Sequence, residues 1–350
     1  MDLYILDENL DTIGIVDNMV SVIWTPRYVD MGDFEVYAPA TQTNVDLLAR
    51  GHYVKRLDDE MVGIIQSIEL TTDVENGNMI LVKGPDLKDI LKRRIIWPVI
   101  QLNDFLHDVI KRLIDYTIIN PALSSRKISN FIVSDDKPLN LDVVKQQITG
   151  DNLLDVISSL CIAQGCGFKV VIENKNFVFK LYKGYIRTGM IFSPEFDNLA
   201  NSDYLYDSTS YANVAYVAGE GEGLDRKMLT VNLPGNVGID RKEIFVDARD
   251  LQSETSEGEV IPTEEYEAML RERGKEKLAE NVTTETFQGE VINEYTYKYK
   301  TDYFLGDIVK VENEFGMKAQ ARITEIIESE DATGHKIIPT FEDWREIEWQ

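Results

Sequence analysis

Cysteine and histidine are scarce in this chain of 350 residues, which contains two cysteines and three histidines. Cys161 and Cys166 cannot build the set of several disulfides that stabilises small secreted domains. His52, His107 and His335 lie far apart, and none has a second ligand at the spacing of a zinc site. The scarcity therefore predicts no disulfide framework, no metal site and no histidine catalyst.

Long apolar runs are also missing from the sequence. No stretch approaches the roughly 18 apolar residues that indicate a membrane-spanning helix. The amino-terminal sequence MDLYILDENLD has neither the basic segment nor the apolar core of a secretion signal. We therefore expect a protein that is made in a cytoplasm and has no membrane span.

Basic residues are few relative to acidic ones: the chain has 36 Lys and Arg residues and 61 Asp and Glu residues, which gives a net charge of −25. Binding of nucleic acid depends on clustered Lys and Arg side chains that contact phosphates. A chain this acidic should instead stay soluble and repel other anions. The composition thus argues against a nucleic-acid-binding function.

Motifs of common catalytic sites are absent as well. The sequence contains neither GxSxG nor HExxH. The stretch GEGEG at 219–223 lacks the Lys and Ser/Thr of a phosphate-binding loop, and its two glutamates would repel phosphate. Acidic residues are so frequent that no carboxylate pair is singled out for glycoside hydrolysis. We therefore assign no catalytic, cofactor-binding or metal-binding residue, and we expect no cofactor.

Short apolar stretches with a period of two dominate residues 1–84. The dipeptide Asn76-Gly77 is the strongest hairpin signal, because both central positions of a tight type I′ turn need positive φ. It should join strands at 68–72 and 79–83. The pattern predicts a first β-barrel over 1–84, completed by strands that return at 191–235.

Helical periodicity appears in residues 85–190 beside a further hairpin signal. This region should form an α+β domain inserted after the first barrel. The expected elements are a short helix after Gly84-Pro85-Asp86, a helix over 103–116 with Asn103 as its N-cap, a helix over 152–164, and a hairpin of strands at 168–172 and 177–181.

The last region, 236–350, should form a second barrel preceded by a helix over 263–281. Gly274 weakens the middle of that helix by roughly 1 kcal/mol relative to alanine. The aromatic residues near the first strand either pack in the barrel or form a subunit interface, where Tyr is enriched; they are Tyr295, Tyr297, Tyr299 and Tyr303. The expected strands are 291–299, 308–311 and 319–324, with a hairpin loop at 312–316 and with Ala319, Ala321 and Ile323 on one face, opposite Gln320, Arg322 and Thr324.

Four stretches, in this order along the chain, together resemble the siphophage tail-tip hub family, which is related to the baseplate hubs of contractile tails. One departure from the family pattern is GYIRTG at 184–189, where a more acidic turn is expected. The four stretches are VSVIWTPRYVDMGDFEVYAPATQTNVDLLARGHYVKR with VGIIQSIEL, NLLDVISSLCIAQGCGFKV, IFSPEFDNLANSDYLYDSTSYANVAYVAGEGEG with FVDARDL, and YFLGDIVKV with KAQARITEI.

The resemblance implies an α+β, mainly β fold with two tube-protein-like β-barrels, an inserted α+β domain, and a helix before the last barrel. It implies a homotrimeric virion protein without catalysis, placed at the tail tip and assembled in the bacterial host cytoplasm. The implied partners are the distal tail protein, the tape-measure protein, and tail fibre or receptor-binding proteins. In many relatives a C-terminal extension carries a lytic or carbohydrate-binding module, and we expect any such activity to come from another protein here. An acidic channel would also let the genome pass without sticking.

Two other functions stay open on the sequence alone. One is a cell-wall hydrolase on a β-rich scaffold, which would turn over peptidoglycan. The other is a carbohydrate- or receptor-binding tail protein, which would present an exposed tryptophan in a groove. The candidates for that role are Trp24, Trp97, Trp344 and Trp349.

Overall fold

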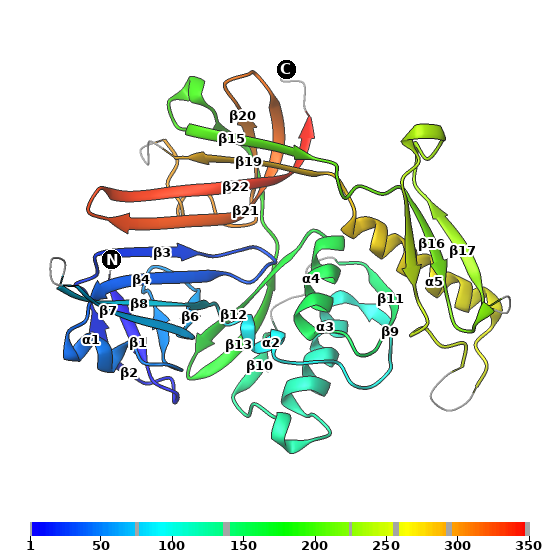
Figure 1. The fold of residues 1–350 in the computed structure, drawn as a ribbon, viewed down its shortest axis with the longest axis horizontal. Helices are drawn as coiled ribbons and strands as arrows, with labels where there is room; N and C mark the ends of the chain where they lie inside the picture. Colours follow the sequence, from blue (N-terminus) through cyan, green and yellow to red (C-terminus); the bar gives the residue numbers. More distant parts are fainter. Residues whose placement is uncertain are drawn as a thin grey trace.

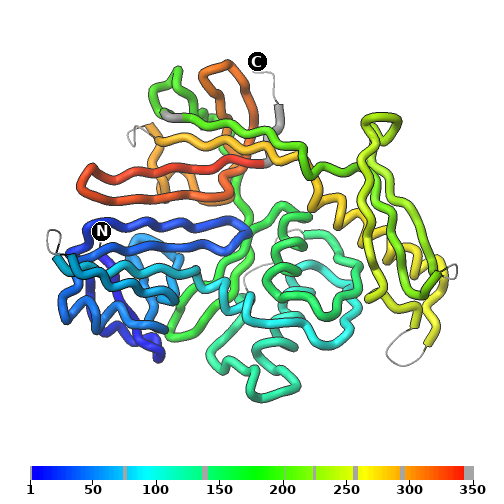
Figure 2. The backbone as a smooth tube through the Cα atoms, viewed as in Figure 1, coloured from blue at the N-terminus to red at the C-terminus, as the bar shows by residue number. Residues whose placement is uncertain are grey.

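The computed structural model describes residues 2–73, 77–135, 141–223, 226–254, 259–291 and 296–346 of the chain. The fold is mainly β, with two β-rich units side by side, a mixed domain beside them, and a smaller α/β layer at the periphery (Figure 1). The course of the chain through these parts is shown in Figure 2. In the part of the chain that the structure describes, the hydrogen-bonded sheets are open.

The N-terminal β unit consists of two sheets that enclose one core. Alternating side chains of β3 and β4 point into that core, where Trp24, Phe34 and Val36 are buried against Leu3 and Ile5 of the facing sheet. The first sheet has the order β2 (Thr12–Val16), β1 (Leu3–Leu6), β5 (Tyr53–Lys55), β6 (Val62–Ile64), and the second holds β3 (Ser21–Thr25), β4 (Asp33–Pro39), β8 (Gly77–Pro85) and β7 (Ser67–Asp73), with α1 (Gln42–Leu47) between β4 and β5.

The C-terminal β unit continues the second sheet of the N-terminal unit. Strand β21 pairs antiparallel with β3, so that Glu328 lies opposite Trp24 and Ser329 opposite Ile23. The strands of this unit are β14 (Ile186–Phe192), β15 (Ala200–Asp207), β19 (Thr284–Glu290), β20 (Ile308–Glu312), β21 (Lys318–Asp331) and β22 (Gly334–Glu346). The result is one ten-stranded sheet, whose main path runs β15-β19-β22-β21-β3-β4-β8-β7 while β14 and β20 lie off that path.

The inserted domain packs its helices on strands around a continuous apolar core. Asn152 caps the longest of these helices, because its side chain accepts a hydrogen bond from Leu154 N at 2.9 Å. The elements are α2 (Asp89–Lys92), β9 (Ile100–Phe105), α3 (Leu106–Ile114) with a π-helical turn η1 (Asp115–Ile119), η2 (Ser124–Arg126), β10 (Phe131–Val133), β11 (Val143–Ile148), α4 (Leu153–Ala163), β12 (Gly167–Glu173) and β13 (Asn176–Tyr182).

The peripheral layer is a three-stranded sheet with one helix against one face (Figure 1). Gly274 in the helix permits this close packing, because a Cβ there would lie 2.6 Å from Val231 Cγ2 and 2.8 Å from Val217 Cγ2. The local cost of a helical glycine is therefore offset by contact with the sheet. The elements are β16 (Val214–Ala218), β17 (Met228–Asn232), β18 (Glu243–Asp247) and α5 (Thr263–Glu280), with single turns η3 (Pro194–Phe196) and η5 (Gly238–Asp240) elsewhere in the chain.

Several sequence predictions are confirmed by these elements. The α+β, mainly β class is confirmed, as are the helices predicted at 152–164 and 263–281. The hairpin of β12 and β13 turns through Asn174 and Lys175, both at positive φ. The pairing of β7 with β8 is also as predicted, although Asn76 itself lies outside the described residues.

Other predictions are wrong. Strands in 191–235 do not complete the first barrel, because β15 pairs with β19 and β16 pairs with β17 and β18. Asn103 is not a helix cap but a residue of β9, where pairing with Lys145 of β11 overrides its capping preference. The described part of 291–299 does not form the strand predicted there, and residues 292–295 lie outside the described residues. The strand in this region is β19, which ends at Glu290 and pairs with β15 and β22.

Candidate functional site

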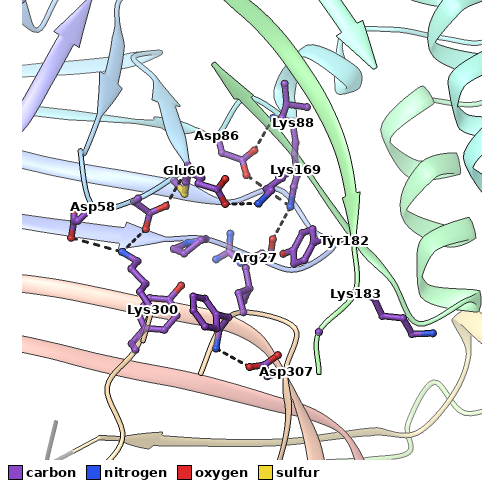
Figure 3. A pocket seen from close by; sticks show the side chains of 18 of the residues that line it. Arg27, Asp58, Glu60, Asp86, Lys88, Lys169, Tyr182, Lys183, Lys300 and Asp307 are labelled. Atoms are coloured by element: carbon purple, nitrogen blue, oxygen red, sulfur yellow. Dashed lines mark hydrogen bonds and ion pairs between the residues drawn. The ribbon is translucent and has the colours of Figure 1, made fainter. Parts of the chain in front are cut away.

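A cavity lies where the two β units and the inserted domain meet. Its volume is about 710 Å³. Segments from all three parts line it, and the labelled side chains in Figure 3 are mostly charged. The lining comes from Pro26 and Arg27, from the loop between β5 and β6, from residues 86–88, from β12 and β13 with the connector that follows them, and from residues 299–307. We call this region the central junction.

Tyr28 is the side chain around which the central junction closes. Its hydroxyl donates to Gly165 O at 3.3 Å and accepts from Gly184 N at 3.4 Å. Glycines make room for its ring, since a Cβ on Gly167 or on Gly306 would lie within 2.4 Å or 2.2 Å of ring carbons. The Arg322 guanidinium carbon lies 5.2 Å from the ring centroid. One aromatic ring of the N-terminal unit therefore contacts both other parts.

Asp307 fixes the connector that leaves the inserted domain. Its carboxylate is buried and accepts from Tyr185 N at 2.7 Å and from Arg187 Nε at 2.7 Å. Gly306, directly before it, has φ of +93°, a backbone conformation that favours glycine. A Cβ on Gly184 of the connector would lie 1.8 Å from Gly306 O, so the two chains cross in direct backbone contact. The LGDIV sequence at 305–309 is thus the crossing point of two segments.

A buried ion network joins the two β units beside this crossing. Arg56 Nη2 lies 3.0 Å from Glu328 Oε2, with both side chains almost fully buried. Lys300 Nζ lies 2.8 Å from Glu328 Oε1 and 2.7 Å from Asp59 Oδ2. Burial alone would raise the pKa of Glu328, but the charges of Arg56 and Lys300 outweigh it and lower that pKa. The network borders a second cavity of about 460 Å³.

Asp86 and Lys88 form a second buried pair on the other side of the cavity (Figure 3). Burial raises the pKa of the Asp86 carboxyl and lowers the pKa of the Lys88 ammonium. Lys88 Nζ lies 4.0 Å from Asp86 Oδ2 and donates to Arg27 O and Asp30 O at 2.7 Å each. Two of the three ammonium donors therefore form hydrogen bonds within the fold, and Asp86 lies at ion-pair distance, which suits a structural role.

Paired charges dominate this arrangement and hold segments of the three parts together. Most of the cations that line the cavity are paired with carboxylates, as Lys169 with Glu60 and Lys300 with Asp59. Lys183 also lines the cavity, but its side chain points away from the other charged groups (Figure 3). Within the described residues, no three His, Cys, Asp or Glu side chains lie together as metal ligands would.

The histidines and tryptophans named by the sequence are not brought together. His52 Nδ1 lies 2.8 Å from Leu47 O, and His107 Nε2 lies 3.3 Å from Ser134 O. Only His335 is near the junction, with Nε2 at 3.5 Å from Glu328. The tryptophans divide as follows: Trp24 is a core residue, Trp97 is exposed, and the side chains of Trp344 and Trp349 lie outside the described ones.

Sequence reasoning missed Tyr28, Gly184 and Asp307 as the residues of the junction. A signal was present for two of them. Gly184 belongs to the stretch that departs from the family pattern, and Asp307 follows a glycine at the start of a predicted strand. Tyr28 carried no signal, because its role depends on contacts with residues about 140 to 290 positions away.

None of the helices in the described part of the chain is long and apolar enough to cross a membrane.

Comparison with known proteins gives a family and a fold. The model of the Siphovirus ReqiPepy6 Gp37-like protein family matches residues 2–341. None of the curated proteins matches the sequence. Among solved structures, a tail protein from Neisseria meningitidis MC58 is similar over 97% of this chain and 96% of its own, with 13% identity and a TM-score of 0.61.

Two further structures share the fold at similar distance. The 43 kDa tail protein of prophage MuSo2 from Shewanella oneidensis aligns over 97% of each chain, with 15% identity and a TM-score of 0.57. The prophage tail protein gp18 from Listeria monocytogenes EGD-e aligns over 98% of this chain and 94% of its own, with 16% identity and a TM-score of 0.51.

Proposed function

The chain belongs to the Siphovirus ReqiPepy6 Gp37-like protein family and is a phage or prophage tail protein, and from this premise we propose that three copies form the hub at the tail tip. The hub closes the tail tube and connects it to the host-binding components. It acts as a structural part of the virion and not as an enzyme. This function fits a central junction that is built from paired charges and close backbone contacts.

The observation that carries the proposal is the path of eight antiparallel strands from β15 to β7. Every neighbouring pair on this path is antiparallel, so the first and last strands run in opposite directions. A rotation about an axis parallel to the strands leaves the direction of every strand unchanged. Copies placed around such an axis would therefore bring β7 of one subunit against β15 of the next in antiparallel register, and the ring closes without exposed edges.

The two end strands, β7 and β15, have exposed edges that could pair with a strand of another chain. All residues of β7 are exposed, and Ile68 and Leu70 lie on its core-facing side, with Leu70 58% exposed. Leu205 and Tyr206 of β15 are likewise exposed. In the described residues, β7 pairs only with β8 and β15 only with β19. Long apolar edges of this kind invite pairing with another chain.

The two β units of each chain allow a trimer to form a ring of six β units. Each chain contributes two units joined edge to edge through β3 and β21, so three chains present six units in one ring. We assign residues 1–84 and 236–350 to the two tube-like regions, apart from β18 and α5, which belong to the peripheral layer. Residues 186–207 join the second region, and residues 85–185 form the inserted domain. The partners of the ring are then the distal tail protein, the tape-measure protein, and fibre or receptor-binding proteins.

The sheet face opposite the core is the surface that such a ring would turn toward its channel. Register places the following charged residues on this face: Asp33, Glu35, Glu69, Asp203, Asp207, Glu290, Glu325 and Glu342, with the cations Lys83, Lys318, Arg322 and Lys336. Carboxylates outnumber cations there, even after Arg27 has paired with Asp33 and Glu325. A channel lined in this way repels phosphate, so the genome can slide through it.

Solution mass and copy number test the proposal. A trimer of 40.0 kDa chains has a mass of about 120 kDa by light scattering. Quantitative mass spectrometry of purified tails should give three copies per particle. Replacing Ile68 and Leu70 with aspartate should leave the monomer folded but prevent closure, whereas the matched change at the exposed Val237 and Ile239 should not. Six or twelve copies per tail would refute the trimeric hub.

A further inference from the structure

A positively charged, partly aromatic surface lies on the inserted domain, well outside the central junction. It is formed by the segment between α2 and β9 together with the turn η2. We call it the basic patch and define it by Arg93, Arg94, Ile95, Trp97, Leu123 and Arg126. Lys92 and Lys127 extend its charge at either margin.

The side chains of the basic patch are held in place by contacts with each other. The Arg126 guanidinium carbon lies 4.2 Å from the centroid of the Trp97 ring, and its Nη2 donates to Ile95 O at 2.6 Å. Arg94 Nη2 donates to Arg126 O at 3.2 Å, which ties the two segments together. The stacked arginine and tryptophan are therefore preorganised, which lowers the entropy lost when a partner binds.

The charge of the basic patch is largely uncompensated. Arg93 is paired with Asp89 at 2.5 Å, but neither Arg94 nor Arg126 has a carboxylate partner among the described residues. This is unusual in a chain with 61 acidic residues and 36 basic ones. Arg94 Nε is buried and has no hydrogen-bond acceptor in the described structure. Burial and the nearby charges of Arg126 and Arg93 lower the pKa of Arg94. A carboxylate supplied from outside would relieve this repulsion.

Apolar side chains make up the rest of the basic patch. Trp97 is 57% exposed, and Ile95 and Leu123 are each about half exposed. Tryptophan and arginine are the residues most often found at the energetic centre of protein interfaces. A polyanion such as a nucleic acid or an anionic glycopolymer could neutralise the arginines but would leave the aliphatic side chains exposed. A protein surface with carboxylates around an apolar centre can satisfy both.

We propose that the basic patch docks another protein of the tail, through a segment in which Asp or Glu residues flank apolar side chains. Charge complementarity favours such a partner, because the remainder of this chain carries a strong negative charge that excludes acidic proteins elsewhere on its surface. The proposal rests on membership of a tail and not on the trimeric ring. If mass and copy number show that the trimeric ring does not form, the proposal for the basic patch is unaffected.

Site-specific crosslinking in assembled tails tests the proposal. Trp97 is replaced with the photoreactive amino acid p-benzoylphenylalanine in the full chain, and irradiated tails are analysed by mass spectrometry. The same amino acid at the exposed Ile239 of η5 serves as the positional control. The expected product joins position 97 to a different tail protein, within a segment that contains both carboxylates and apolar residues.

Charge reversal shows whether the arginines provide the attraction. R94E/R126E should reduce the crosslink at position 97 about tenfold or more, as expected for loss of interface arginines. R271E/K275E on the exposed face of α5 makes the same change in charge and should leave the yield unaltered. If R94E/R126E prevents assembly, the crosslinked partner is purified and its binding to the wild-type chain is measured instead. That affinity should fall about tenfold or more between low and high salt.

Four results would overturn the proposal. They are a crosslink only to a second copy of this chain, a crosslink only to an anionic polymer of the cell surface, no crosslink in assembled tails, and a yield or affinity that responds neither to charge reversal nor to salt.

Discussion

At the scale of single residues, the glycine and the acid of the LGDIV sequence are what hold the central junction together. Gly306 allows the chain to pass against Tyr28, and Asp307 binds the backbone and the arginine of the connector. Neither residue would be chosen as functional in a search for catalysts. Their importance comes from where two segments cross, which makes their replacement costly for the fold.

Substitution of Gly306 with alanine should destabilise the protein by about 3 kcal/mol. About 1 kcal/mol comes from forcing alanine to positive φ, and the rest from a Cβ placed 2.2 Å from the Tyr28 ring. Gly316→Ala is the matched control, because Gly316 also has positive φ but no atom lies within 4 Å of its Cβ position. Urea unfolding of both variants measures the difference. Equal losses in the two variants would mean that contact with Tyr28 has no energetic weight.

Glu328→Gln should make stability less dependent on acid pH. Arg56, Lys300 and His335 face Glu328, and its pKa is lower in the folded chain than its ordinary value of 4.5. Its stabilising effect is therefore fully present above about pH 4.5 and is lost as the pH falls through the folded pKa. We expect the variant to lose about 2–4 kcal/mol at pH 7, where Arg56 stays buried, and less at pH 3.

Unfolding free energies of the wild type and Glu328→Gln across pH 3 to 7 test this expectation. Glu264→Gln, on the exposed first turn of α5, is the control and should leave the profile unchanged. A difference between wild type and Glu328→Gln that stays constant over this range would show that the carboxylate does not act through its charge.

At the scale of elements, local signals were reliable where the chain satisfies its own hydrogen bonds. The helices α4 and α5 and the hairpin of β12 and β13 follow from periodicity, caps and turn residues. Prediction failed where a distant partner decides. Asn103 has the side chain of an N-cap, but β11 holds it in a strand, and the return strand β15 pairs with β19, not with the first unit.

Two asparagines allow this distinction to be measured. Asn152→Ala should cost about 1–2 kcal/mol, because its side chain caps α4 and also donates to Lys92 O at 2.7 Å. Asn103→Ala removes the same atoms from an exposed strand position and should cost less than about 0.5 kcal/mol. Thermal and denaturant unfolding of both variants gives the comparison. A larger loss for Asn103→Ala would indicate that Asn103 contributes to the fold in a way that pairing does not explain.

At the scale of the whole molecule, the sequence identified the family but not the geometry of the sheet that joins the two β units. The pairing of Trp24 with Glu328 connects residues about 300 positions apart, and no local period can specify such a partner. The central junction was equally out of reach, because its cavity is lined by six separate segments. The net charge, by contrast, is a property of the sequence and constrains any assembly of several copies.

Salt should favour the proposed ring. Each subunit carries a charge of −25, so three subunits repel each other strongly when their sheets are joined at β7 and β15. Raising the ionic strength from about 0.01 to 0.15 M shortens the Debye length from about 30 to 8 Å and should weaken this repulsion. Light scattering at fixed protein concentration should therefore show a larger trimer fraction at the higher salt. The I68D/L70D variant adds charge at the edge and should stay monomeric in both, whereas V237D/I239D should follow the wild type. Trimers that dissociate as salt is added would show instead that attraction between charged groups, and not pairing of the apolar edges, holds the ring together.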